Sequence, residues 1–524
     1  MALTDGPGDD YDHVWITVKA ISFHTDPNLA WDKNDATWQT TTLPAPITLD
    51  MANLTNGALN KVFSGMNLPV GTYRQIRLFL AGFDDTLTAS ASAVTPAPLI
   101  YNDQVDYTDA TGVHHVPLEI AYPTQGIQLN GNFNVTAGGT LNLAVDFDLE
   151  HDLVRMKHGA DVSFTMKPDL RYFDLDQAGA ITGNVNSLQL CTTPVSATCG
   201  YNLIVKAEIL SADGSRHVDT RATRVKADGS FTLYPLPSGK TYDVLIRGRN
   251  IETMLVKGVT TPAGSTPASG AAALSTSTAP IQLVINSAES FANFGSALAP
   301  TSGYAVFQQT LPTPVSGVPE VPYEVRWANT NTFTGKLEGP IALSTGVLHV
   351  ANYSAGSAPT FSSATPQEAA GGFTVATRGL PLAYYKLSSP ATILTSATNT
   401  AASPLTFAPP APTLTSDIVA GTVSGTITQT TPGTFDSGYV VLSRFASIVD
   451  TVNIGPSLAA NSIPYSATLP AGTASASVPG AYYYGHLIVW NSAHPLLTLK
   501  VIPIPNKIDL RNTSTVAGLN VTLP

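Results

Sequence analysis

Short runs in which apolar and polar residues alternate recur along the whole chain, separated by turns rich in glycine and proline. In LPVGTYRQIRLFL (68–80), Ile76, Leu78 and Leu80 occupy alternate positions after a Pro/Gly turn and a tyrosine. Alternation with a period of two predicts a β-strand with one buried face. The pattern therefore predicts an all-β chain.

The unit "proline turn, tyrosine, strand" returns three more times, in LPSGKTYDVLI (236–246), LPLAYYKLS (380–388) and VPGAYYYGHLIVW (478–490). Such a turn sets where an antiparallel strand begins, the ring covers the end of the core, and the hydroxyl reaches backbone or water. We interpret the repeated unit as packing of serial antiparallel β-sandwiches, immunoglobulin-like or transthyretin-like, and not as a catalytic motif.

A second echo, Gly-Tyr before an apolar strand, occurs at Tyr201, Tyr304 and Tyr439. Its distance to the tyrosine of the proline-turn unit is similar in the second and fourth parts and about twice as long in the third, which indicates an insertion or a different domain there. With a Pro-rich linker near 407–417, the chain divides into four predicted blocks: 1–175, 179–287, 288–412 and 413–524. About 100 to 200 residues per domain agrees with this number.

Helix-like spacing occurs only in the first block, where Leu54, Leu59 and Val62 predict one or two short helices. The first block is therefore expected to be a β domain with short helical decoration.

Composition narrows the class of protein. Charged residues make up only 12 % of the 524 residues, hydrophobic residues 43 %, and the net charge is −11. A Lys/Arg surface for nucleic acid is not predicted. No run of about 18 apolar residues predicts a membrane helix. The opening MALTDGPGDD is not a signal peptide, so we expect the mature part of an exported chain.

The two cysteines, Cys191 and Cys199, flank a short polar loop between apolar strands. A hairpin-like loop can bring them within disulfide reach, which would indicate an oxidising compartment. The alternative is two ordinary thiols.

Two acidic clusters are candidates for a metal site. Asp5, Asp9, Asp10 and Asp12 surround a Gly-Pro-Gly turn, and Asp146 and Asp148 share one face of a later strand. Calcium prefers six to eight oxygen ligands on such turns, so the clusters could share one calcium ion if the two strands meet. The alternative is a solvated turn with polar strand edges.

Exposed aromatic residues are candidates for binding a polymer. Trp31 and Trp38 lie in a polar loop, and at least one of three consecutive tyrosines around Tyr483 must face away from the core. Core or edge packing is the alternative interpretation.

Covalent chemistry has little support in the sequence. No G-x-S-x-G elbow and no HExxH helix motif is present. An intramolecular isopeptide bond between Lys206 and Asn250 or Asn286, assisted by Glu208, is conceivable, although no motif for it is present.

In order, LTDGPGDDYDHVWITVKAISFH, LPVGTYRQIRLFL, GIQLNGNFNVTAGGTLNLAVDFDLEHDLV and MKPDLR resemble a bacterial domain of unknown function found at the N-terminus of exported lipoproteins. The resemblance covers about 1–175. It implies an extracytoplasmic, mostly β domain, lipid-anchored through a cysteine upstream of residue 1. It implies no activity.

ADGSFTLYPLPSGKTYDVLIRGRNIETMLVKGV, in the second block, resembles the carboxypeptidase-regulatory-like, transthyretin-like sandwich of secreted modular proteins. The resemblance implies a spacer or stability module and no enzyme.

These observations predict a non-enzymatic protein of the outer cell surface that displays or binds an extracellular ligand, a polymer or another surface protein. A subunit of a filament, sheath or surface layer, formed by edge-to-edge association, is the alternative. A secreted hydrolase is a second alternative.

Overall fold

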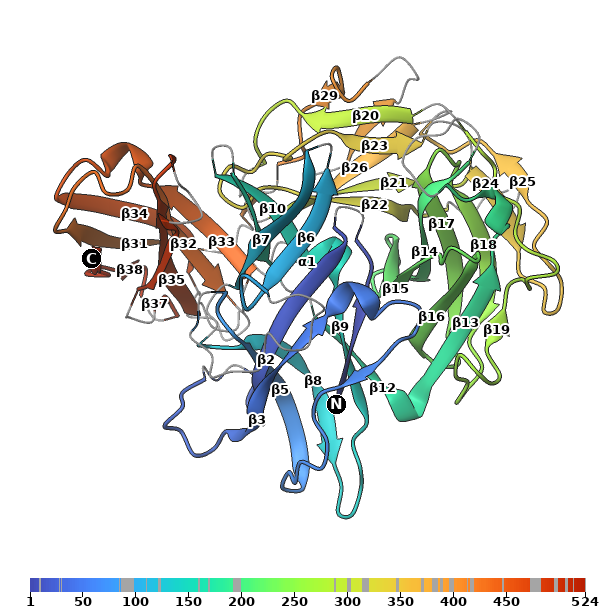
Figure 1. The fold of residues 1–524 in the computed structure, drawn as a ribbon, viewed down its shortest axis with the longest axis horizontal. Helices are drawn as coiled ribbons and strands as arrows, with labels where there is room; N and C mark the ends of the chain where they lie inside the picture. Colours follow the sequence, from blue (N-terminus) through green and yellow to red (C-terminus); the bar gives the residue numbers. More distant parts are fainter. Residues whose placement is uncertain are drawn as a thin grey trace.

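The computed structural model shows a protein built almost entirely of β-strands (Figure 1). It describes residues 1–524 apart from 9–10, 28, 30, 84, 86–98, 110, 121–123, 159–160, 168–169, 192–198, 287–288, 299–302, 313–319, 345–347, 369–371, 379–384, 387–389, 395–399, 412, 415–418, 445–446, 472–481, 494–497, 505–507, 512 and 524. The predicted all-β class of antiparallel sandwiches is confirmed.

The first block forms two sheets with one hydrophobic core between them. The smaller sheet has the order β12-β9-β1-β4, and the larger one β10-β11-β7-β6-β2-β5-β8, with β3 on the free side of β2. The strands are β1 (Ala2–Gly6), β2 (His13–His24), β3 (Gln39–Asp50), β4 (Asn60–Lys61), β5 (Gly71–Leu80), β6 (Gln104–Asp109), β7 (Gly112–Ile120), β8 (Ile127–Val135), β9 (Leu143–Asp148), β10 (Leu153–His158), β11 (Asp161–Met166) and β12 (Arg171–Asp174).

Helical structure in the first block is shorter than predicted. A single 3-10 turn, η1 (Met51–Asn53), precedes Leu54, and the two-residue strand β4 stands where the helix was expected. The prediction is therefore confirmed only as one 3-10 turn: Leu54 and Val62 enter the core of the first block, whereas Leu59 packs beside Ala178, Ala180 and Tyr234. The other helical elements here are α1 (Leu149–Asp152) and η3 (Leu175–Gln177).

The rest of the chain repeats one sandwich topology three times. The inner sheets run β16-β13-β19, β23-β20-β29 and β34-β31-β38, and the facing sheets contain β15-β14-β17-β18, β22-β21-β26-β28 and β33-β32-β35-β36. In each copy the Gly-Tyr strand is central, and the later parallel partner (β19, β29 or β38) joins the first strand. The Gly-Tyr echo therefore marks equivalent strands of three copies. The proline-turn echo marks the neighbouring strand, β17 or β35, only in the second and fourth copies, because in the third copy that place belongs to β26, and Tyr385–Lys386 form β27, which pairs with β30.

The strands of these copies run from Ala178 to Leu523. They are β13 (Ala178–Asn184), β14 (Tyr201–Leu210), β15 (His217–Arg224), β16 (Ser230–Pro237), β17 (Thr241–Arg249), β18 (Met254–Thr260), β19 (Ala272–Ala273), β20 (Glu289–Phe294), β21 (Tyr304–Gln309), β22 (Tyr323–Asn329), β23 (Ile341–Ser344), β24 (Leu348–Asn352), β25 (Ser362–Ala364), β26 (Gly372–Arg378), β27 (Tyr385–Lys386), β28 (Ala391–Leu394), β29 (Leu405–Phe407), β30 (Thr413–Leu414), β31 (Val419–Gln429), β32 (Ser437–Arg444), β33 (Ser447–Asn453), β34 (Ser462–Ala471), β35 (Tyr482–Trp490), β36 (Lys500–Pro503), β37 (Ile508–Asp509), β38 (Thr515–Val516) and β39 (Val521–Leu523), with the 3-10 turns η4 (Ser187–Gln189) and η5 (Gly455–Ser457).

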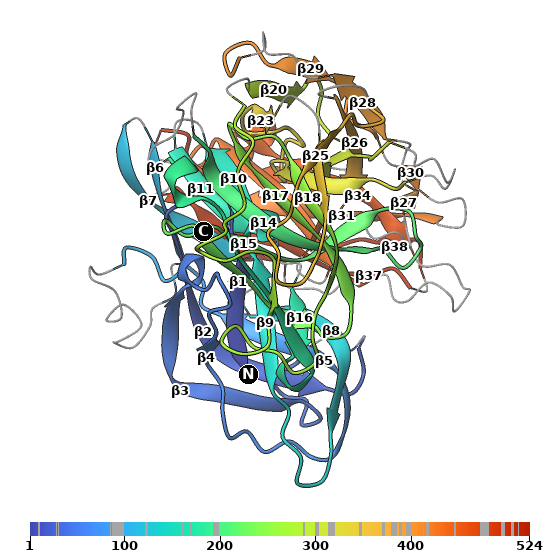
Figure 2. The ribbon, with the colours of Figure 1, turned by 90° about the vertical axis from the view of Figure 1, so that its right-hand side faces the viewer.

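The third copy carries an insertion, and this insertion ties it to the second. β24 and β25 lie between β23 and β26 in sequence, yet β24 pairs in parallel with β18 of the second copy. β24 and β25 continue that sheet beyond β18; they lie on the right-hand side of Figure 1, the side that faces the viewer in Figure 2. The predicted boundary at 287/288 is therefore crossed by a continuous sheet.

That sheet is buried on both faces. Along β17, Val244 and Ile246 enter the core of the second copy, whereas Leu245 packs into the core of the third, and all three are fully buried. Both cores therefore share one middle sheet, so the second and third copies form one continuous layered unit and not two separate domains.

The fourth copy, orange to red in Figure 1, packs against the first block. The outer face of its β32-β33-β35 sheet contributes Val441, Ile448 and Ile488 to an apolar cluster with Val154 and Met156 of β10. The fourth copy is thus held against the first block by an apolar interface.

The proline-turn tyrosines behave as packing residues. The hydroxyls of Tyr73 and Tyr242 each donate a hydrogen bond at 3.0 Å to a carbonyl oxygen, of Pro69 and Pro237 respectively, while both rings are buried. The bond fixes the turn to the following strand, as the sequence predicts. The third unit, with Tyr384, lies outside the described residues.

Candidate functional site

A cluster of buried charged side chains lies where the first three blocks meet. The end of β9, helix α1 and β12 contribute from the first block, β14, β15 and β17 from the second, and β22 from the third. Burial of so many ionisable groups costs free energy unless each is paired.

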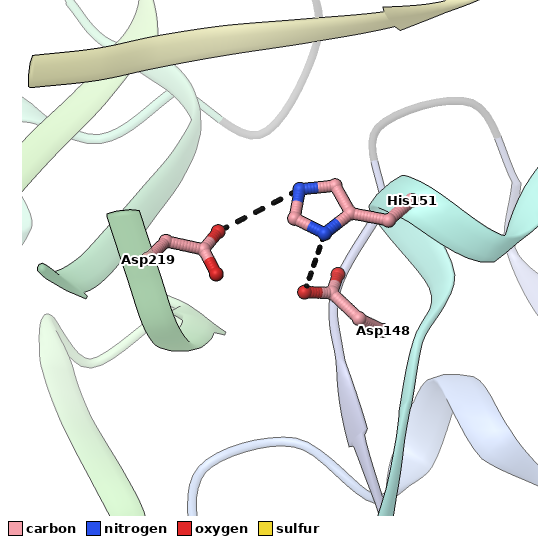
Figure 3. A group of neighbouring side chains, drawn as sticks. All are labelled: Asp148, His151 and Asp219. Carbon is pink, nitrogen blue, oxygen red and sulfur yellow. Dashed lines mark ion pairs between the residues drawn. The ribbon is translucent and has the colours of Figure 1, made fainter. Parts of the chain in front are cut away.

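His151 is at the centre of the cluster (Figure 3). Its Nδ1 lies 2.9 Å from Asp148 Oδ2, and its Nε2 lies 3.6 Å from Asp219 Oδ2. Asp148 and His151 come from the β9–α1 corner, whereas Asp219 comes from β15, so the imidazole bridges two blocks. All three side chains are 1 % exposed.

Two cations, Arg171 and Lys206, both pair with Asp219, and each pairs with a second carboxylate as well. Arg171 Nη1 lies 2.7 Å from Asp219 Oδ1 and 3.4 Å from Asp148 Oδ2. Lys206 Nζ lies 3.0 Å from Glu150 Oε2 and 3.5 Å from Asp219 Oδ2. Each cation therefore joins a side chain of one block to a side chain of the other.

The pKa shifts of Asp219 and Lys206 favour the charged forms of both side chains. Burial alone would raise the pKa of Asp219, but Arg171, His151 and Lys206 outweigh it and lower that pKa. Burial would lower the pKa of Lys206, but Glu150 and Asp219 outweigh it and raise that pKa. Opposite charges close together in a low dielectric favour the charged forms.

Arg221 makes a second bridge between the first two blocks. It is fully buried; its guanidinium pairs with Asp146, donates to Thr4 Oγ1 at 2.7 Å and donates to the carbonyl oxygen of Tyr234 at 3.2 Å. A planar guanidinium with several fixed donors suits such a many-sided contact.

The third block closes the cluster from the other side. Trp327 of β22 stacks on the His151 imidazole with 3.2 Å between ring centroids, and on Tyr304 with 4.1 Å. Asn329 Nδ2 donates to the carbonyl oxygens of Glu150, His151 and Leu153 at 2.9 to 3.2 Å. These carbonyls end α1 and have no partner within so short a helix.

Asp148, His151 and Asp219 are also the residues that could hold a metal ion, because one ligand atom of each lies within 4.8 Å of the others. The same carboxylates already face Arg171 and Lys206. A divalent cation would enter beside these positive charges, so the arrangement suits a network of ion pairs better than a metal centre.

The predicted calcium residues divide into three groups. β1 and β9 pair in parallel, with Thr4 opposite Asp146 and Gly6 opposite Asp148, so the two strands do meet and bring Asp5 to the cluster. Asp12 lies elsewhere, exposed and accepting a hydrogen bond from Thr108. Asp9 and Asp10 lie outside the described residues. Calcium binding stays a prediction.

Asp5 differs from its neighbours in its charge state. Burial, reinforced by the nearby Asp146, raises its pKa well above the usual range, and its Oδ1 accepts a hydrogen bond at 3.2 Å from the backbone N–H of Leu149. A raised pKa favours the neutral form of Asp5, which makes this carboxyl a poorer ligand for a cation.

The aromatic residues singled out for ligand binding are mostly internal. Trp38 is 6 % exposed and lies beside His24, and Tyr483 is fully buried with its hydroxyl donating to the carbonyl oxygen of Pro470. Exposure of these two was wrongly predicted, because the polar loop folds back over the sheet and Tyr483 is the inward-facing tyrosine of its run. Trp31 is partly buried against Phe79.

The disulfide and isopeptide predictions have different outcomes. Cys191 and Cys199 are joined by a disulfide with 5.5 Å between their Cα atoms. Lys206 pairs with Glu150 and Asp219 as described above, whereas Asn286 Nδ2 donates to Glu252, so the structure does not bring Lys206 to that asparagine.

Three residues of the cluster were not predicted from the sequence: Arg171, Asp219 and Arg221. One signal was present: the β14 strand places Lys206 and Glu208 inside an otherwise apolar run, and charged residues are rare in this chain. Their partners are distant in sequence, so no local spacing marks them.

Comparison with known families identifies the beginning of the chain. Residues 1–168 match the model of a domain of unknown function, DUF4382. The DUF4382 domain therefore supplies Asp148 and His151, whereas Asp219 lies after it. β12, which contributes Arg171, continues the smaller DUF4382 sheet just beyond the matched residues.

No curated protein matches the chain. Among solved structures, the Bacillus anthracis TIE protein is 9 % identical at a TM-score of 0.15, with 99 % of this chain and 72 % of that chain covered. A streptococcal ancillary pilin is 9 % identical at a TM-score of 0.15, with 66 % of this chain and 99 % of that chain covered. The pilus adhesin SpaC from Lactobacillus rhamnosus GG is 13 % identical at a TM-score of 0.15, with 98 % of this chain and 57 % of that chain covered.

Proposed function

We propose that this chain is a non-enzymatic protein of the outer cell surface that displays or binds an extracellular ligand on a rigid body. The observation that carries the proposal is the closed junction between the DUF4382 domain and the sandwiches. Its charges are paired across blocks and its centre is 1 % exposed. Such a cluster can fix blocks together, but a substrate cannot reach it.

Two further junctions support a rigid body. The second and third copies share the middle sheet through β18 and β24, and the fourth copy packs on β10 through its apolar outer face. Interfaces that continue a sheet or bury an apolar cluster restrict relative motion of domains. A ligand site whose walls come from two blocks needs blocks that are held in fixed positions.

Three of the free sheet edges carry proline. Among the described strands, β3, β34 and β36 each pair with one neighbour only, and each contains proline: Pro44 and Pro46, Pro464 and Pro470, and Pro503. Proline lacks the N–H needed for pairing, and natural proteins use it to protect edges. A filament built through these edges is therefore disfavoured.

Export is supported by the disulfide, since such bonds persist in oxidising compartments. Within the described residues, no helix is long and apolar enough to cross a membrane. We propose that the chain reaches the outer surface and is held there by a lipid anchor upstream of residue 1.

Two measurements test the proposal. Protease treatment of intact source cells should degrade the chain while a cytoplasmic marker survives. Light scattering during size exclusion should give a mass near 54.8 kDa at every concentration. Protection from protease in intact cells would overturn the surface location, and growth of the mass with concentration would favour the filament alternative.

A further inference from the structure

A cavity of about 250 Å³ opens beside the charged junction, between the first and third blocks. Tyr11, Arg155 and Phe164 line it from the first block, and Arg326, Trp327 and Glu338 from the third. Its two walls therefore come from segments that only the folded chain brings together.

Arg155 supplies a positively charged group to this wall. Among the residues that the structure describes, no carboxylate pairs with its guanidinium, and its buried Nε has no hydrogen-bond partner. Its Cζ lies 4.8 Å from the centroid of the Tyr107 ring, which holds the guanidinium in place.

The acidic residues of the lining are already engaged. Glu150 pairs with Lys206 and Arg247, and Glu338 accepts from Asn331 and lies 3.9 Å from Lys157. Their negative charge is balanced outside the cavity.

A second donor points to the same conclusion. The indole Nε1 of Trp327 is buried and has no hydrogen-bond partner, while both faces of its ring are covered, by His151 and Tyr304. A covered ring offers no stacking surface, so the unpartnered N–H is the polar group that this lining residue brings to the cavity wall. A buried donor without a partner costs free energy, which a ligand oxygen would recover.

We propose that this cavity binds a small organic anion through one carboxylate, with the Arg155 guanidinium as its counter-ion. A guanidinium and a carboxylate form two parallel hydrogen bonds, and the volume is below that of a typical drug-sized site, about 300 to 1,000 Å³. The ligand is therefore no larger than about one acidic sugar. The inference rests on the proposed binding role and names the chemistry of its ligand.

Such a carboxylate has two sources, an acidic sugar of a surface polymer or a free organic acid. Isothermal titration of the full chain with glucuronate, succinate and, as a neutral control, glucose separates them. We expect saturable binding of glucuronate, succinate or both, and none of glucose. Glucuronate alone would indicate the sugar, and succinate alone the free acid.

Variants assign the binding to Arg155. Arg155→Gln should weaken the affinity at least tenfold, and Arg155→Lys, which keeps the charge but loses the fork, should weaken it less. Arg74→Gln, at an exposed arginine on β5, should leave it unchanged. Tm of each variant is measured beside the titration, and Arg155→Lys serves if Arg155→Gln does not fold.

Two results would overturn the inference: no saturable binding of either acid by the unmodified chain, or binding equal in the Arg155 variants. A surface-exposed 54.8 kDa monomer that binds neither acid would remove only this inference. Protection from protease in intact cells would remove the proposed function itself.

Discussion

At the scale of single residues, the motif tyrosines link a turn to the strand that follows it. We predict that Tyr242→Phe lowers the free energy of unfolding by about 0.5 to 1.5 kcal/mol, because the carbonyl of Pro237 loses its donor while the ring stays in place. Urea unfolding measures this. Tyr353→Phe, at a half-buried tyrosine with no hydroxyl bond among the described residues, should change little, and equal losses in both would contradict the assignment.

Glu208 predicts a pH dependence. Burial raises its pKa well above the usual range, so the folded chain holds this proton where the unfolded chain, with a pKa of about 4.3, releases it. Its contribution to stability is complete below that value and is lost as pH rises toward the folded pKa, by up to about 1.4 kcal/mol per pH unit.

Glu208→Gln should therefore raise Tm relative to the unmodified chain at pH 8 and not at pH 4, since an amide needs no proton uptake. Glu320→Gln, at a half-buried carboxyl paired with Lys257, is the control. A Tm gain that is equal at both pH values would show that Glu208 is ionised in the folded chain.

At the scale of elements, the buried pair between β9 and β15 should be far stronger than an exposed one. Arg221→Met leaves Asp146 buried without its partner and should cost about 3 to 5 kcal/mol. The exposed pair of Arg511 with Asp509 provides a matched control, since Arg511→Met should cost less than about 1 kcal/mol. Similar losses for both variants would mean that Arg221 does not tie the blocks together.

The pairing of β1 with β9 bears on the predicted calcium site, because it places Asp5 close to Asp146. Calcium at Asp5 and Asp146 would have to displace Arg221 from Asp146. Because this displacement would leave a buried guanidinium without its partner, the existing ion pair is favoured over calcium. We therefore expect the same Tm in millimolar calcium and in chelator. A rise in Tm with calcium that is absent in Asp5→Asn would establish the predicted site.

At the scale of the whole molecule, His486 makes the attachment of the fourth copy sensitive to acid. Burial lowers its pKa to about 4, opposed by Glu119 of β7, the titratable residue that faces it in the small cavity between the two blocks. Its contribution to stability is complete above the unfolded pKa of about 6.5 and is lost as pH falls toward 4.

We predict that unfolding of the unmodified chain becomes easier between pH 7 and pH 4.5, and that His486→Gln removes part of this dependence. His13→Gln, at a histidine whose side chain is 46 % exposed, should retain it. The measurement is urea unfolding at both pH values. An unchanged pH dependence in His486→Gln would show that the junction is not sensitive to this histidine.

The sequence by itself determined the class of the fold and its repeats. Alternation, proline turns and Gly-Tyr strands are local signals, because each depends only on a strand's own inner face and the turn that begins it. They placed Tyr201, Tyr304 and Tyr439 on equivalent strands and marked an insertion in the third block.

Only the tertiary structure decided which residues form the site and the seams. Leu245 faces a second core because another block covers its sheet, and Asp148, His151 and Asp219 meet because β15 packs on the β9–α1 corner. Trp38 and Tyr483 were misplaced for the same reason. Charge pairing and burial between distant segments depend on how blocks dock, and docking leaves no periodic pattern in a single chain.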